Sequence, residues 1–321
     1  MSSTDGELGA AGAQQLDGLL PLFRELNGLK RIRTAGKTGS WAERLFIRAW
    51  VRFLAREDIG QVAREETASA VVATSLAGID AAVLASGGVP TEARLEIFQR
   101  AFDTVCAPLA PALVVALRAT LTGEPLREPT ATVPPFVPLL AAQPRAGATR
   151  PGYPRVILEP AENHAEHCAI VAVNGVLAAG VFGADPAGPF LTGLAHHLHN
   201  AYLPDAGDAG DVLLGEHLPS LMEHFRAQAL QELPAFLHEP VRRSLTAVYR
   251  ADTPDARAFQ AADSVDRVLE MEWHARSAAF TLDVALGEMD IIHPGPVQAF
   301  QLEVMRALRL PISQPPSSPC N

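Results

Sequence analysis

The spacing of apolar residues predicts helices along most of the chain. From Leu16 to Leu29, and again from Trp41 to Arg56, apolar side chains recur every three or four residues, which is the period of an amphipathic helix. Comparable segments are expected at about 59–85, 91–102, 162–182, 188–201, 214–232, 240–250, 256–286 and 296–308. Since no segment alternates convincingly as a strand would, the predicted fold class is all-α.

The distribution of prolines suggests where the chain divides. Eight prolines fall between Thr122 and Pro154, with Pro134-Pro135 at the centre and no sustained periodicity, which is typical of a linker or an extended strap. The expected organisation is a disordered tail (1–13), a helical bundle (14–121), a Pro-rich linker (122–155), a second helical domain (156–310) and a loose tail (311–321).

Charge and cysteine content narrow the functional classes. The net charge is −10, and residues 1–150 carry +1 while residues 151–321 carry −11, which disfavours nucleic acid as a partner. Three scattered cysteines and a polar, acidic N-terminus without an apolar segment indicate a cytoplasmic protein. The longest apolar run, Ala169–Phe182, is shorter than the roughly 18 residues that a membrane helix needs, so no membrane association is expected.

The histidines indicate where chemistry is to be expected. All ten lie between His164 and His293. Three segments of this half place polar residues on apolar helical faces, and the residues concerned are His167, the pair His199-Asn200, and Asp263. A buried imidazole or carboxylate costs free energy unless it is satisfied. A shared metal ion would satisfy all of them, and hydrogen bonds among themselves are the alternative.

These segments together resemble the HD superfamily of metal-dependent phosphohydrolases, in particular the branch that contains bacterial 5′-deoxynucleotidases. The matching motifs are Glu162-Asn163-His164-Ala165-Glu166-His167, the pair His199-Asn200 followed eight residues on by Gly207-Asp208, and Ala262-Asp263. The resemblance covers about residues 150–285. It implies an HD-type helical domain with a divalent metal ion (Mn, Co, Mg, Zn or Fe) held by His167, His199, Asn200 and Asp263.

The resemblance also implies a function, which is hydrolysis of a nucleotide or another small phosphate ester. Two residues depart from the family pattern, because Asn200 replaces the aspartate of the HD pair and Leu203 replaces an acidic residue. Proton transfer is therefore expected to fall to Asp208, Asp205 or Glu166, and contacts with the phosphorylated substrate to Arg267 and His196.

Two other interpretations remain open. The domain is a catalytically degenerate HD domain that binds a ligand or partner, or it is an HD-type di-iron oxygenase that uses the additional histidines His217, His224 and His238. Elemental analysis distinguishes these classes. The apolar helical faces in residues 41–121 are also compatible with a homodimer.

Overall fold

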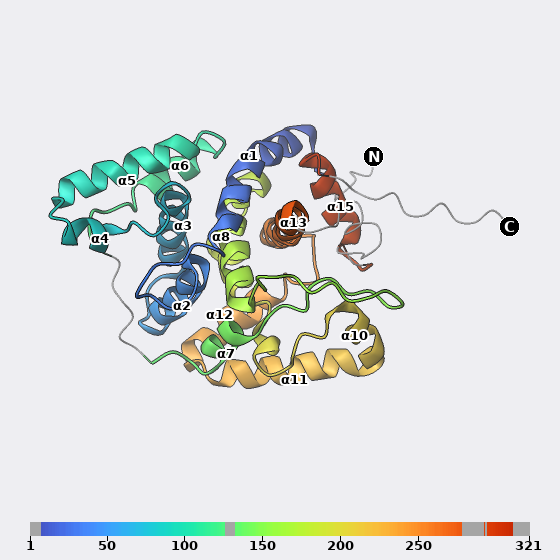
Figure 1. The fold of residues 1–321 in the computed structure, drawn as a ribbon. Coiled ribbons are helices and arrows are strands. Elements are labelled where there is room, and N and C mark those ends of the chain that lie inside the picture. The colour runs from blue at the N-terminus through green and yellow to red at the C-terminus, as the bar shows by residue number, and fades with distance from the viewer. Residues whose placement is uncertain (1–7, 126–131, 278–291, 293, 311–321) are drawn as a thin grey trace.

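The structure, a computed structural model, describes residues 8–125, 132–277, 292 and 294–310. Within these residues the protein is all-α, as predicted, and its extended segments form only three isolated bridges and no strand (Figure 1). The predicted loose tail and most of the predicted N-terminal tail lie outside the described residues, although the first helix already begins at Ala10.

The helices of the first half are α1 (Ala10–Gly28), α2 (Trp41–Leu54), α3 (Ile59–Leu76), α4 (Ala81–Ser86), α5 (Thr91–Val105), α6 (Pro111–Arg118) and α7 (Phe136–Ala142). Those of the second half are α8 (His164–Phe182), α9 (Ala187–Ala195), α10 (Gly207–Leu214), α11 (Leu218–Gln231), α12 (Ala235–Leu245), α13 (Pro254–Ser277) and α15 (Gln298–Ala307), with 3-10 turns at η1 (Leu198–Ala201) and η2 (Gly215–His217).

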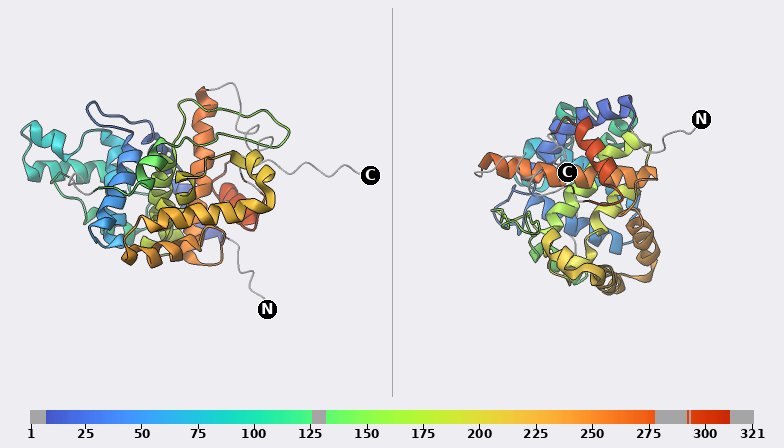
Figure 2. Two further views of the ribbon diagram at one scale, coloured as in Figure 1. Left: turned by 90° about the horizontal axis from the view of Figure 1, so that it is seen from below. Right: turned by 90° about the vertical axis from the view of Figure 1, so that its right-hand side faces the viewer.

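Helix α8 is the central element of the fold. It lies between α2 and α3 on one side and α13 on the other (Figures 1 and 2), and every residue from His164 to Ala179 is buried. A capping box formed by Asn163 and Glu166 begins the helix, and left-handed Gly183 ends it. Since all sides of α8 are buried, most of its side chains are apolar on every side of the helix.

The apolar character of α8 has a second reading. By length and composition this helix is also long and apolar enough to cross a membrane, whereas the sequence predicts no membrane association. However, 83% of the relevant window is buried among other helices of this fold. Burial in the protein core is therefore sufficient to account for its apolar sequence.

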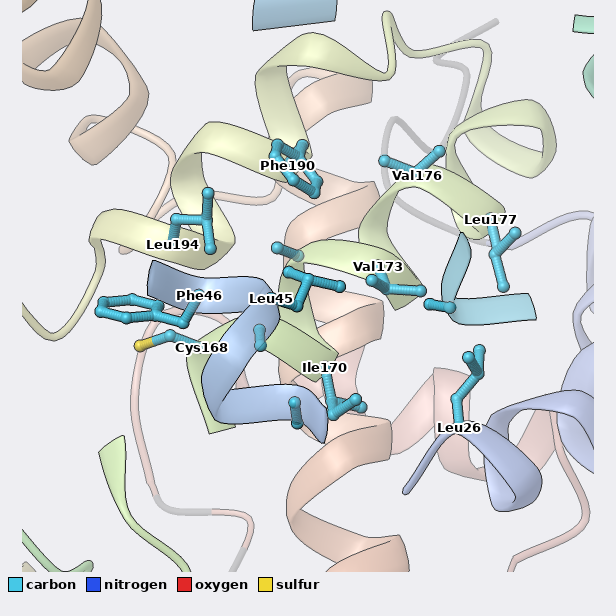
Figure 3. Close-up of a cluster of buried hydrophobic side chains, with 14 of the residues drawn as sticks. Leu26, Leu45, Phe46, Cys168, Ile170, Val173, Val176, Leu177, Phe190 and Leu194 are labelled. Atoms are coloured by element: carbon cyan, nitrogen blue, oxygen red, sulfur yellow. The ribbon is translucent and has the colours of Figure 1, made fainter. Parts of the chain in front are cut away.

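One hydrophobic core runs across the boundary that the prolines suggested. Leu26, Leu45 and Phe46 of the first half pack with Ile170 and Leu194 of the second half in a single cluster (Figure 3). The predicted bundle and the predicted second domain therefore do not have separate cores.

The segment expected to be a linker is also integrated into the fold. Its residues 126–131 are outside the described part of the chain, but α7 buries Phe136, Val137 and Leu140 completely. The following residues pair by isolated bridges, Pro144 with Asn163 and Ala148 with Val156. The segment thus runs back to the start of α8 and contributes to the site described below.

The crossing of α8 and α9 predicts a sensitive position at Gly193. A Cβ atom there would lie 2.5 Å from the Cα atom of Ala172, so the helices approach too closely for any side chain. Gly193→Ala is expected to lower the free energy of unfolding by about 1–3 kcal/mol, measured by urea denaturation. In contrast, Gly28→Ala, where a Cβ would meet nothing within 4 Å, should change it by less than about 0.5 kcal/mol or stabilise the protein. Equal effects of the two substitutions would contradict this packing.

Candidate metal centre

Three donor atoms from three helices converge beneath a cavity. His167 lies in the first turn of α8, His196 follows the last residue of α9, and Asp263 lies in the middle of α13. The Nε2 atom of His167 is 3.1 Å from Nε2 of His196 and 3.3 Å from Oδ1 of Asp263, and the third edge, from His196 to Asp263, is 3.8 Å. Both imidazoles are buried, while the Asp263 carboxylate is 15% exposed.

Neighbouring acceptors determine which nitrogen of each imidazole carries a proton. Nδ1 of His167 lies 2.7 Å from Oδ2 of Asp266, and Nδ1 of His196 lies 2.7 Å from the carbonyl oxygen of Gly193. Since both partners can only accept, each Nδ1 is the donor. When both rings are neutral, their Nε2 lone pairs face each other and the Asp263 carboxylate.

Three electron-rich atoms this close repel one another unless a cation lies among them. A second proton on His167 would relieve the repulsion, and so would a metal ion. Donor atoms that bind one first-row divalent ion at about 2.0–2.2 Å lie about 3.0–3.6 Å apart, close to the edges observed here. A carboxylate that fixes the outer nitrogen of a ligand histidine, as Asp266 does for His167, is typical of metal sites. The donor set therefore fits a divalent metal.

The charges around this group act in opposite directions. Burial and Arg145 oppose protonation of His167, but hydrogen bonds with Asp263 and Asp266 raise its pKa above the ordinary value. Burial and the neighbouring His167 hold the pKa of His196 well below its usual range. Burial opposes ionisation of Asp263, yet Arg267 and the two imidazoles lower its pKa far below the usual range, so this carboxylate stays charged.

The structure does not bring His199 and Asn200 into this group. Two other combinations of described residues, His167 with His196 and His197, and Glu162 with His167 and Asp266, bring potential ligand atoms within 4.8 Å of one another, and neither includes His199. Asn200 instead accepts a hydrogen bond from Nδ1 of His197 at 2.7 Å and donates to the carbonyl oxygen of Leu203. The predicted second ligand pair is thus displaced by three residues, because the chain leaves α9 at His196 and enters η1 before it reaches His199.

A cavity of about 750 Å³ opens over the metal-capable group. Its polar lining includes Arg145, Arg155, Arg267, His197, His199 and three aspartates (Asp205, Asp208 and Asp211). Its apolar lining includes Met222, Val248, Tyr249 and Phe259. The cavity is therefore lined by both charged and apolar side chains, which is typical of sites for small organic ligands.

Two arginines stand directly beside the candidate centre. Nη1 of Arg145 donates to Nε2 of His197 at 2.7 Å, and burial, His196 and Arg145 hold the pKa of that imidazole well below its usual range. Arg267 forms an ion pair with Asp263 at 3.0 Å, so its predicted place at the substrate is compatible with the structure. Arg145 lies in the supposed linker, which is why the sequence analysis missed it.

Two of the residues expected to transfer protons have different surroundings. Glu166 is buried in the capping box, where its carboxylate accepts from the backbone N–H of Asn163, and it does not line the cavity. The structure therefore gives Glu166 a capping role, and its predicted catalytic role stays a prediction. Asp208 does line the cavity, in the first turn of α10. Burial and the charges of Asp205 and Asp208 raise the pKa of neighbouring Asp211 to about 6, the range in which acid–base catalysis operates at neutral pH.

Asp266 is a site residue that the sequence pattern could have indicated. It lies three positions after Asp263 in the same helix, so the two carboxylates share one face. Both contact His167. Two carboxylates three residues apart on one face of a helix are a signal that the match to Asp263 alone concealed.

Comparisons with known proteins do not add to this picture. No family model, no curated protein and no solved structure matches the chain.

Proposed function

We propose that the chain is a metal-dependent phosphohydrolase of the HD type, with His167, His196 and Asp263 as ligands of a single divalent ion. The observation that carries the proposal is the triangle of donor atoms, with both histidines fixed so that Nε2 faces the centre. In this arrangement His196-His197, rather than His199-Asn200, takes the place of the family's HD pair. The order along the chain, histidine then histidine pair then aspartate, is unchanged.

The chain's own residues fit a phosphate ester as substrate. Arg145 and Arg267 point their charge to the same region as the ion would occupy, so they can bind phosphate oxygens beside it. A divalent ion held here supplies Lewis acidity toward a phosphoryl oxygen and toward water. Asp211 holds a proton near neutral pH and is the candidate donor to the leaving group. The apolar wall around Val248 and Phe259 would receive the organic part of the ester.

The additional histidines do not support an oxygenase with two irons. His217, His224 and His238 belong to none of the metal-capable groups found among the described residues. Nε2 of His238 instead contacts the carbonyl oxygen of Leu233 at 2.8 Å.

Removal of the metal provides the test. Protein purified without chelator is expected to contain one divalent ion per chain by elemental analysis and to hydrolyse p-nitrophenyl phosphate or a nucleoside monophosphate. Dialysis against EDTA should reduce turnover at least about 100-fold, and one equivalent of Mn²⁺ should restore it. Metal binding without any turnover would favour a ligand-binding module. Protein that binds no ion at all would contradict the site itself.

A further inference from the structure

A buried lysine lies directly behind the candidate metal centre. Lys30 follows α1, and only 3% of its surface is exposed. Its ammonium nitrogen is 2.5 Å from Oε1 of Glu162, 2.7 and 2.9 Å from the two carboxylate oxygens of Asp266, and 3.4 Å from Oε2 of Glu270. We call these four residues the Lys30 cage. Three buried carboxylates from two distant parts of the chain thus surround one cation.

The cage carboxylates depend on that cation. Oε1 of Glu162 and Oδ1 of Asp266 are buried and accept no hydrogen bond from any described residue, so the ammonium charge is what holds them. Buried anions without a partner cost several kcal/mol each, so the cage requires a positive charge at its centre.

The position of this charge also has the character of a metal site. The carboxylates of Glu162, Asp266 and Glu270 each have an oxygen atom near the ammonium nitrogen, at 2.5, 2.7 and 3.4 Å. Carboxylate oxygens are the ligands preferred by hard divalent ions such as Mg²⁺ and Mn²⁺. Asp266 joins the two positions, because Oδ2 accepts from His167 while both of its oxygens contact Lys30.

We propose that the Lys30 ammonium is a built-in cation that fills a second metal position, and that it limits the protein to one divalent ion. Removing the ammonium should open the cage to an additional ion. The inference rests on the proposed function only for the first ion, because the second position is tested by the difference between variant and wild type.

Mn²⁺ is the probe, and equilibrium dialysis with elemental analysis measures the ratio of ion to chain. Wild-type protein is expected to bind one Mn²⁺, and Lys30→Ala to bind two. Mn²⁺ should also raise the thermal midpoint of Lys30→Ala more than that of the wild type, because it replaces the missing charge. Lys30→Arg, which keeps a cation, should bind one ion. Lys30→Ala combined with Asp266→Asn, which removes a shared ligand, should gain none over the wild type.

The outcomes separate the two proposals. A wild type that binds no ion, together with Lys30→Ala that binds one, would refute the proposed function and support the Lys30 cage. An equal ratio in wild type and Lys30→Ala would overturn the cage proposal, as would two ions in the wild type. If Lys30→Ala does not fold without Mn²⁺, the same Mn²⁺-binding measurement is made with Lys30→Gln, which keeps most of the side-chain stem. Failure of both variants to fold in the presence of Mn²⁺ would also overturn the proposal, because a suitable ion should restore the charge.

Discussion

His196→Gln is expected to lower the affinity for Mn²⁺ or Zn²⁺ by about 100-fold or more, whereas His199→Gln leaves it within about threefold. The two histidines make a matched pair. They are three residues apart, both are buried, and both line the same cavity. Only His196 points a ring nitrogen at His167 and Asp263, at 3.1 and 3.8 Å.

The difference follows from what each imidazole contacts. Nδ1 of His196 is held by the Gly193 carbonyl, so its Nε2 is already oriented toward the other donors and binding costs little reorganisation. Nδ1 of His199 is buried and has no hydrogen-bond partner among the described residues, and its ring lies 5.8 Å from that of His197, measured between centroids.

Isothermal titration of metal-free protein measures the two affinities, with far-UV circular dichroism to verify that both variants are folded. The two variants should also differ in turnover, because phosphatase activity should be lost in His196→Gln and retained in His199→Gln. A larger loss of affinity in His199→Gln than in His196→Gln would restore the ligand set that the sequence resemblance implied.

The protein is expected to lose stability as the pH falls from about 6.5 toward 4. Four histidines whose pKa values are lowered by burial should account for much of this loss, namely His164, His196, His197 and His199. Burial and Arg145 lower the pKa of His164 to about 3, and burial and Arg226 lower the pKa of His199 to about 4. In the unfolded chain both titrate near 6.5. Above pH 6.5 both are neutral in either state and their contribution to stability is fully present.

Between 6.5 and the lowered values only the unfolded state takes up protons, so the free energy of unfolding declines with falling pH. At pH 4.5 each histidine accounts for a loss of up to about 2.5 kcal/mol. Urea denaturation at pH 7.5, 6.0 and 4.5 measures the decline. His164→Gln should make it shallower, and His217→Gln, at an exposed position, should not. A decline that is as steep in His164→Gln as in the wild type would assign the acid sensitivity to other groups.

The helical fold was readable from the sequence because periodicity is a local property. Helix α2 was predicted at 41–56 and runs from Trp41 to Leu54, and α8 was predicted at 162–182 and runs from His164 to Phe182. That one core spans both halves of the chain could not be predicted from the sequence, since it depends on how α2 and α3 pack against α8. Prolines suggested a boundary, yet the same segment packs Phe136 into the core.

The residues of the candidate site could also be predicted only in part. His167 and Asp263 were predicted because each is a polar residue within a segment whose apolar residues have helical spacing. The choice between His196 and His199 depended on where α9 ends, and the ends of helices are weakly encoded by periodicity. Arg145 and Lys30 lie outside the sequence segments that contain His167, His196 and Asp263. Only the tertiary structure therefore shows that they belong to the site.

The Lys30 cage also has a consequence for how the protein is made. During synthesis the first three helices leave the ribosome long before α13, which carries Asp266 and Glu270. Until then Glu162 is the one cage carboxylate that Lys30 can contact, and the apolar faces of α1 to α3 have only part of their eventual partners. We therefore expect the nascent chain to stay incompletely folded until residues near 277 have emerged, so chaperone demand should fall late in translation. A gene cut at the proline-rich segment would yield two aggregation-prone fragments rather than two working modules.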